Sequence, residues 1–162
     1  MRPRLIVAGI FSLAIVGCGT EPAPYLGSDP ATEKYAASLG VDIAQMTEVN
    51  TALYKQDLVV GTGATAANGD TLRVTYTGWL ISGVSFDSNV GKTPLPFVLG
   101  AGQVIPGWDQ GMIGVQVGGK RRLVIGSRLA YGQAGAGCDQ LSCVIPPNST
   151  LVFDVQLVSK SP

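Results

Sequence analysis

The 162-residue chain carries eleven basic and eleven acidic side chains and no histidine. Hydrophobic residues make up 46% of the chain and charged residues 14%, as in one globular domain with room for a leader and a linker. The balanced charge argues against a nucleic-acid partner. The lack of imidazole excludes Ser/His and Cys/His nucleophile activation and the commonest zinc ligand, so we expect neither a metal nor a cofactor.

Residues 1–17 have the pattern of a secretion signal. Arg2 and Arg4 precede an apolar run that is shorter than the roughly 20 residues needed to span a bilayer. We therefore expect a leader peptide, which marks the chain as exported.

The leader ends in a segment that resembles a bacterial lipobox, residues 15–18, with sequence Ile-Val-Gly-Cys. In that pattern the signal peptidase cleaves before the cysteine, whose sulfur carries a diacylglycerol, so we expect lipidation at Cys18. An ordinary signal peptide that happens to end near a cysteine is the alternative. Gly19 is not the aspartate that marks inner-membrane retention, which favours the outer membrane if the cell has one.

Residues 18–52 are predicted to form a tether and approach segment before the folded domain. Residues 21–24 and 28–30 contain prolines and polar side chains typical of an extended spacer. Residues 31–46 are less polar, and three apolar side chains at helical spacing predict a short helix there: Leu39, Ile43 and Met46.

Residues 53–162 are predicted to form the domain, with strands as its main element. Apolar and polar residues alternate over residues 71–77 and again over residues 151–157, as in strands with one buried face. In the second segment the inward residues are expected to be Leu151, Phe153, Val155 and Leu157. Shorter strands are expected over residues 58–60, 97–99 and 120–125.

One segment of the domain, residues 106–115, has the pattern of a helix. It starts with a proline, and Trp108, Met112 and Val115 can share one face. A short helix among antiparallel strands predicts an α+β fold, in which a curved sheet wraps around the helix.

Two cysteines, Cys138 and Cys143, lie in a glycine-rich loop. With Cys18 assigned to the lipid, an exported compartment favours a disulfide between them. A metal site is the weaker alternative, because the chain has no histidine and no second pair of thiols.

Seven short segments occur in the order found in FKBP-type peptidyl-prolyl cis-trans isomerases. They are residues 74–78 (VTYTG), 86–88 (FDS), 97–100 (FVLG), 104–108 (VIPGW), 130–132 (AYG), 145–147 (IPP) and 150–155 (TLVFDV). The chain resembles that family over about residues 53–159. The resemblance implies a half-barrel sheet, an enzyme that accelerates rotation about X-Pro bonds, proline-containing polypeptides as substrates and macrolides of this family as inhibitors. We also expect a monomer.

The same resemblance implies which residues form the site. The residues expected to act on the amide are Tyr76, Asp87, Ile105, Trp108 and Tyr131. Those expected to hold the substrate are Phe86, Leu95, Val104, Ile145 and Phe153. Trp108 would form the floor, the backbone N–H of Ile105 would bind the ligand carbonyl, and Ile145 would overhang the pocket.

Several of these residues also have a purely structural interpretation. Tyr76 and Phe153 lie on inward faces of strands and Trp108 on a short helix, where core packing alone explains a large ring. Asp87 follows a turn and could satisfy backbone donors there.

The chain departs from the family in two places. Leu95 stands where the family often has an aromatic ring at the pocket edge, and residues 133–144 form a longer loop than in minimal members. We hypothesise that the disulfide fixes this loop over the substrate.

The site supports more than one function. The first is an isomerase that assists the folding of exported proteins. The alternatives are a non-catalytic proline-binding chaperone module and, less well supported, an adhesion protein of the cell surface.

Overall fold

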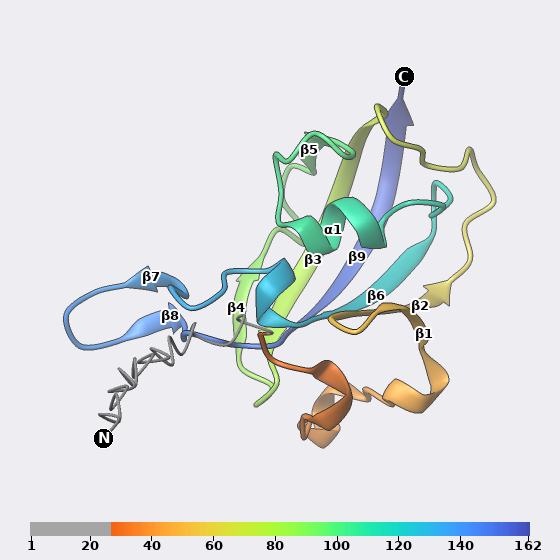
Figure 1. Ribbon diagram of the computed structural model, residues 1–162. Coiled ribbons are helices and arrows are strands. Elements are labelled where there is room, and N and C mark those ends of the chain that lie inside the picture. The colour runs from red at the N-terminus through yellow and green to blue at the C-terminus, as the bar shows by residue number, and fades with distance from the viewer. Residues whose placement is uncertain (1–26) are drawn as a thin grey trace, which may run out of the picture.

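The computed structural model describes residues 27–162, so the predicted leader and the predicted lipidation site at Cys18 lie outside the described residues (Figure 1). The strands are β1 (Thr47–Asn50), β2 (Leu53–Val59), β3 (Thr71–Leu80), β4 (Ser85–Ser88), β5 (Leu95–Val98), β6 (Lys120–Ile125), β7 (Ala136–Cys138), β8 (Cys143–Ile145) and β9 (Leu151–Ser161). The one α-helix of this part is α1 (Pro106–Gly111), and single 3-10 turns lie at Pro30–Thr32, Ala37–Leu39, Ile43–Gln45 and Ser127–Leu129. Within residues 27–162 no helix has the length and apolar character needed to cross a membrane.

Seven strands form one antiparallel sheet in the order β1-β2-β6-β9-β3-β4, with β5 also paired to β3. β9 lies at the centre, because it pairs with β6 on one side and along the whole length of β3 on the other. Its alternate residues Leu151, Phe153, Val155 and Leu157 are buried, as the alternation predicted, but Val152 and Asp154 on the other face, which was expected to be solvated, are buried too. β7 and β8 form a separate two-stranded hairpin.

The helix α1 packs against one face of this sheet (Figure 1). Trp108, Met112 and Val115 are all buried in the main core, although only Trp108 lies within the helix. Gly107 allows the close approach, since a Cβ there would lie 2.4 Å from Cγ2 of Ile125 on β6. An antiparallel sheet wrapped around one short helix is the α+β fold that the sequence predicted.

Two predicted elements have different bounds in the structure. The helix ends at Gly111 and does not reach residue 115, because Gly114 adopts a left-handed conformation with φ +82° that a helix cannot continue through. The strand predicted over residues 58–60 instead runs from Leu53 to Val59, and Val60 is 71% exposed. A register shift after Asp57 carries the apolar end of this strand away from the core.

Residues 28–46 lie against the face of the sheet opposite α1. Leu39 is buried there with Tyr54, Val124 and Val152 in a second apolar cluster. Arg122 on β6 pairs with Asp154 on β9 and donates to the carbonyl of Leu39, which joins this segment to the sheet.

The expectation of an extended spacer over residues 28–30 is therefore wrong. Pro30 is buried, and the hydroxyl of Ser28 accepts hydrogen bonds from the backbone N–H of Ser127 and the hydroxyl of Thr150. The helix expected over residues 31–46 is also wrong: the segment makes three separate 3-10 turns, and Gly40, at φ +58°, ends the second of them.

The buried guanidinium of Arg121 on β6 joins the end of α1 to the sheet. It donates to both carboxylate oxygens of Asp57 on β2, at 2.6 and 2.9 Å. It also donates to the carbonyls of Gly111 and Ile113, both at 2.9 Å. The last carbonyls of a helix have no partner within the helix, so Arg121 supplies the missing donors.

Replacing Arg121 by methionine should lower the free energy of unfolding by about 3 kcal/mol, because it leaves a carboxylate and the carbonyls of Gly111 and Ile113 without their donor. Urea denaturation measures this. The control Arg73→Met removes an exposed arginine of β3 and should change stability by less than about 0.5 kcal/mol. Equal losses in the two variants would contradict the role given to Arg121.

Candidate active site

A cavity of about 190 Å³ opens between the sheet and α1. Its lining comes from four strands, two loops and the helix α1, which are far apart in sequence: Tyr76, Phe86, Asp87, Leu95, Gln103, Val104, Ile105, Trp108, Tyr131 and Phe153. The lining is therefore mostly aromatic and aliphatic, with one carboxylate at its edge. Among residues 27–162 no three His, Cys, Asp or Glu side chains are grouped as they would be in a metal site.

Trp108 lies at the centre of a cluster of aromatic rings and is 3% exposed. Its ring meets Tyr76 at a centroid distance of 5.0 Å and Phe153 at 5.4 Å, both nearly perpendicular. Phe97 packs on it at 5.8 Å. Within the described chain its indole N–H is a buried donor with no hydrogen-bond partner, so ring packing holds Trp108 in place.

Gly78 on β3 makes room for two further rings. A Cβ at this position would lie 2.6 Å from Phe86 and 2.8 Å from Phe153, closer than any real contact. Without that atom the two rings approach each other edge to face, with centroids 5.5 Å apart. The wall of the cavity between β4 and β9 therefore depends on a residue without a side chain.

Two tyrosine hydroxyls and a carboxylate are the titratable groups of the cavity. The hydroxyl of Tyr76 donates to Asp87 at 2.5 Å. Burial raises the pKa of Tyr76, and the hydrogen bond to Asp87 and its negative charge raise it further. Burial, followed by the charge of Asp87, also raises the pKa of Tyr131. Both hydroxyls therefore stay protonated, and able to donate, at neutral pH.

The segment before α1 carries Ile105 to the rim of the cavity. The carbonyl of Ile105 accepts the N–H of Trp108 at 2.9 Å, which fixes its backbone at the start of the helix. Two residues earlier, the side-chain oxygen of Gln103 accepts the N–H of Val98 on β5 at 2.8 Å. This hydrogen bond ties the rim segment to the strand that carries Leu95.

The structure brings nine of the ten residues expected from the sequence to this one cavity. The exception is Ile145, which was expected to overhang the pocket. It is 4% exposed and packs in the main apolar core, because the short strand β8 turns its side chain inward. The roles expected of the other nine stay predictions, but their placement together is a finding.

Sequence reasoning missed Gln103. It is polar and exposed and lies between a glycine and the apolar Val104, a position that suggests a solvated loop. Its place directly before the 104–108 motif was the one available signal. The structural interpretation of Tyr76, Phe153 and Trp108 also holds, since the rings that line the cavity pack against the core at the same time.

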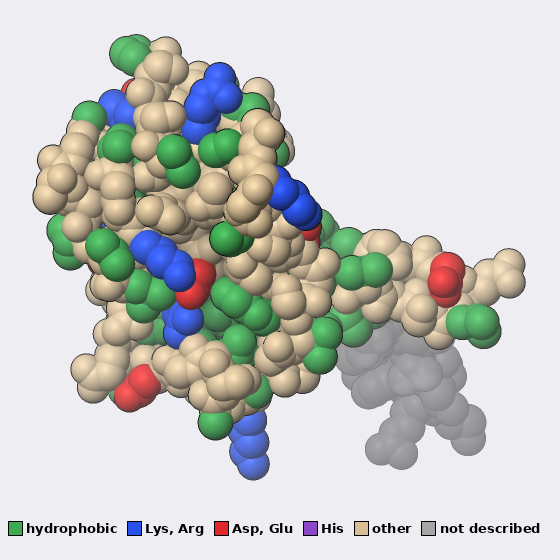
Figure 2. Space-filling view, turned by 180° about the vertical axis from the view of Figure 1, so that it is seen from behind, with side chains coloured by type: hydrophobic (Ala, Val, Ile, Leu, Met, Phe, Trp, Pro, Cys, Tyr) green, Lys and Arg blue, Asp and Glu red, His purple; other side chains and the backbone are tan. Residues whose placement is uncertain are grey.

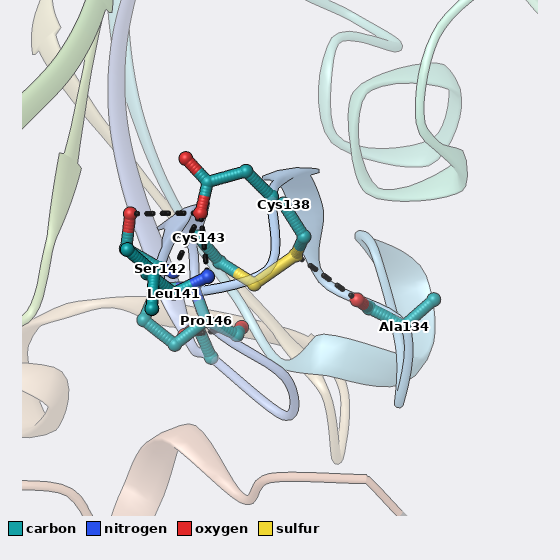
Figure 3. Close-up of a disulfide and its surroundings, with 8 residues drawn as sticks. Ala134, Cys138, Leu141, Ser142, Cys143 and Pro146 are labelled. Atoms are coloured by element: carbon teal, nitrogen blue, oxygen red, sulfur yellow. Dashed lines mark hydrogen bonds between the residues drawn. A yellow bond between two sulfur atoms is a disulfide. The ribbon is translucent and has the colours of Figure 1, made fainter.

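The predicted disulfide joins Cys138 and Cys143, which face each other across the hairpin of β7 and β8 (Figure 3). The carboxylate of Asp139 closes the turn by accepting the N–H groups of Leu141 and Ser142 at 2.8 Å. The hairpin stands out from the body of the molecule in both overall views (Figures 1 and 2), and Leu141 near its tip is 97% exposed.

The hypothesis that the disulfide holds this loop over the substrate is not supported by its position. None of residues 133–144 lines the cavity. Tyr131, just before the loop, is the contribution of this part of the chain. The reason is that β7 and β8 pair with each other and not with the main sheet. The backbone hydrogen bonds of the loop are therefore made within a separate hairpin, which points outward.

The double variant Cys138→Ser/Cys143→Ser should therefore bind proline peptides, and turn them over, with an affinity and a rate within about twofold of those of the unchanged protein. The reason is that none of residues 133–144 lines the cavity. Limited proteolysis should cut the hairpin sooner, because the disulfide restricts its opening. A loss of turnover greater than about tenfold, with the fold intact by circular dichroism, would contradict this placement.

Residues 63–158 match the sequence profile of the family described as FKBP-type peptidyl-prolyl cis-trans isomerase. The chain is 47% identical over 108 residues to the FK506-binding protein of Neisseria meningitidis serogroup A, covering 66% of this chain and 94% of that protein. It is 44% identical over 115 residues, 71% of this chain, to FK506-binding protein 4 of Rhizopus delemar, of which it spans 29%. The crystal structure of AtFKBP13 superposes with a TM-score of 0.62 at 45% identity, covering 67% of this chain and 93% of that one.

Proposed function

The chain belongs to the FKBP-type peptidyl-prolyl cis-trans isomerases, and from that premise we propose that the cavity over Trp108 is where it binds and rotates the X-Pro bonds of polypeptides. The observation that carries this proposal is the aromatic lining, in which Trp108 meets both Tyr76 and Phe153 edge to face. Uncatalysed rotation about an X-Pro bond takes tens to hundreds of seconds and can limit the rate of folding, so an isomerase would speed the folding of its substrates.

The chemistry of the reaction suits an apolar cavity. Conjugation between the nitrogen lone pair and the carbonyl gives the peptide bond a rotational barrier of about 18–20 kcal/mol. In the twisted amide this conjugation is broken and the charge separation between oxygen and nitrogen is smaller. A water-poor aromatic surface favours the twisted form over the planar one, and each 1.4 kcal/mol or so of that preference speeds the reaction about tenfold.

The polar groups of the cavity have a supporting role in this proposal. Tyr131 and Ile105 line the cavity, and we expect the hydroxyl of the first and the backbone N–H of the second to orient the carbonyl groups on either side of the proline. Asp87 holds the hydroxyl of Tyr76 and thereby the position of that ring. Rotation needs no covalent step and no proton transfer, which agrees with a chain that has no histidine.

A protease-coupled assay on a proline tetrapeptide tests the proposal. We expect acceleration that is inhibited by FK506, the compound named in several relatives. Because both tyrosine hydroxyls have raised pKa values, and no imidazole is present, the rate should be flat between about pH 6 and about pH 9.

A rate equal to that of the uncatalysed reaction would overturn the enzymatic function. If the protein then still bound FK506 or a proline peptide, the non-catalytic proline-binding module would be the better description. The exposed Leu95 in the cavity wall, in place of an aromatic ring, is the feature that favours this second candidate.

We further propose that the chain acts on exported proteins, as a monomer anchored to the cell envelope through a lipid on Cys18, with the outer membrane favoured if the cell has one. The support is the leader pattern and the lipobox-like residues 15–18. Mass spectrometry of the mature chain should find a diacylated N-terminal Cys18. A mature chain with an unmodified Cys18 would overturn the anchor and leave the isomerase proposal intact.

A further inference from the structure

A second groove of about 420 Å³ lies directly beside the candidate active site. Its lining residues are Asn68, Gly100, Gly102, Val104, Pro106, Asp109, Gln110 and Ile113. Val104 lines both this groove and the cavity over Trp108. The two hollows are therefore neighbours that share the side chain of Val104.

The groove offers apolar contact surface that nothing in the described part of the chain covers. Ile113 is 41% exposed, and Pro106 is exposed beside it at the start of α1. A single exposed isoleucine is common on protein surfaces. Here it lines a groove that shares Val104 with the cavity over Trp108, so a polypeptide bound in that cavity can extend toward it.

The groove also carries one fixed negative charge. The two carboxylate oxygens of Asp109 accept the N–H groups of Gly100 and Gly102 at 2.8 and 2.9 Å. These bonds hold the carboxylate at the groove wall and leave its remaining lone pairs for other donors. A negative charge in this position favours a basic side chain over an acidic one.

We propose that this groove binds the residues of the substrate polypeptide that flank the X-Pro bond, with a preference for an apolar residue against Ile113 and a basic one near Asp109. The proposal rests on the proposed isomerase function, since it takes the X-Pro bond to lie over Trp108. An extended chain advances about 3.3 Å per residue, and because Val104 lines both hollows, residues close to the proline can reach the groove.

The test compares substrates of different length on the full protein. The assay measures kcat/KM for a proline tetrapeptide and for two longer peptides. One longer peptide carries four added residues before the tetrapeptide, and the other carries four added residues after it. Each long peptide is made with either lysine or glutamate among its added apolar residues. We expect at least one lysine-containing long peptide to exceed the tetrapeptide by about fivefold and its glutamate counterpart by a similar factor.

Two variants assign any such gain to the groove. Ile113→Ser should bring the ratio of long-peptide to tetrapeptide kcat/KM close to one, and Asp109→Asn should remove the preference for lysine over glutamate. The control Val158→Ser changes an equally exposed apolar residue on β9, outside the groove, and should leave the ratio as it is.

The outcomes separate this proposal from the one it rests on. If the tetrapeptide is turned over but neither extension raises kcat/KM, or if the gain survives Ile113→Ser, the groove is not a substrate site and the isomerase function stands. If no peptide is turned over, the isomerase function fails and the groove proposal falls with it.

Discussion

Trp108 packs its indole against the rings of Tyr76, Phe97 and Phe153, and the geometry of the candidate site depends on that packing. The three partner rings come from β3, β5 and β9, so a single side chain of α1 contacts three strands of the sheet. Edge-to-face ring pairs stabilise by about 0.5–1.5 kcal/mol beyond the burial of their surface. The same contacts that hold the helix on the sheet thereby form the floor of the cavity.

Two features outside the cavity keep α1 where this packing needs it. Gly107 lets the helix backbone lie against Ile125, and Arg121 binds the carbonyls at the end of the helix while it pairs with Asp57. Glycine and a buried arginine would each be unfavourable choices for a helix packed on a sheet in isolation. Together they allow a helix of only six residues to hold a fixed position.

The sequence alone predicted which side chains are buried where the residues next to them along the chain decide which side faces the core. The alternation in β3 and β9 predicted their buried faces, and the shared side of Trp108 and Met112 followed from helical spacing. Grouping these residues into one cavity needed the family resemblance, because periodicity alone cannot distinguish a ring in the core from a ring in a site.

The failures have a common cause in contacts that hydrophobic periodicity does not reveal. Residues 28–46 look like a spacer, but Arg122 and the apolar patch around Val124 bind them to the sheet from more than eighty positions away. Ile145 resembles a pocket residue, yet the pairing of β7 with β8 turns it into the core. The role of Gln103 depends on its hydrogen bond to Val98, which no local pattern indicates.

We propose that the apolar floor of the cavity, and not a hydrogen bond from it, favours the twisted amide. Exchange NMR of a proline peptide with catalytic amounts of Trp108→Leu and Trp108→Gln tests this directly, since the two side chains are similar in size and differ in polarity. With both variants folded by circular dichroism, the leucine variant should exchange cis and trans peptide at least about tenfold faster than the glutamine variant. Equal rates, or a faster glutamine variant, would contradict the account.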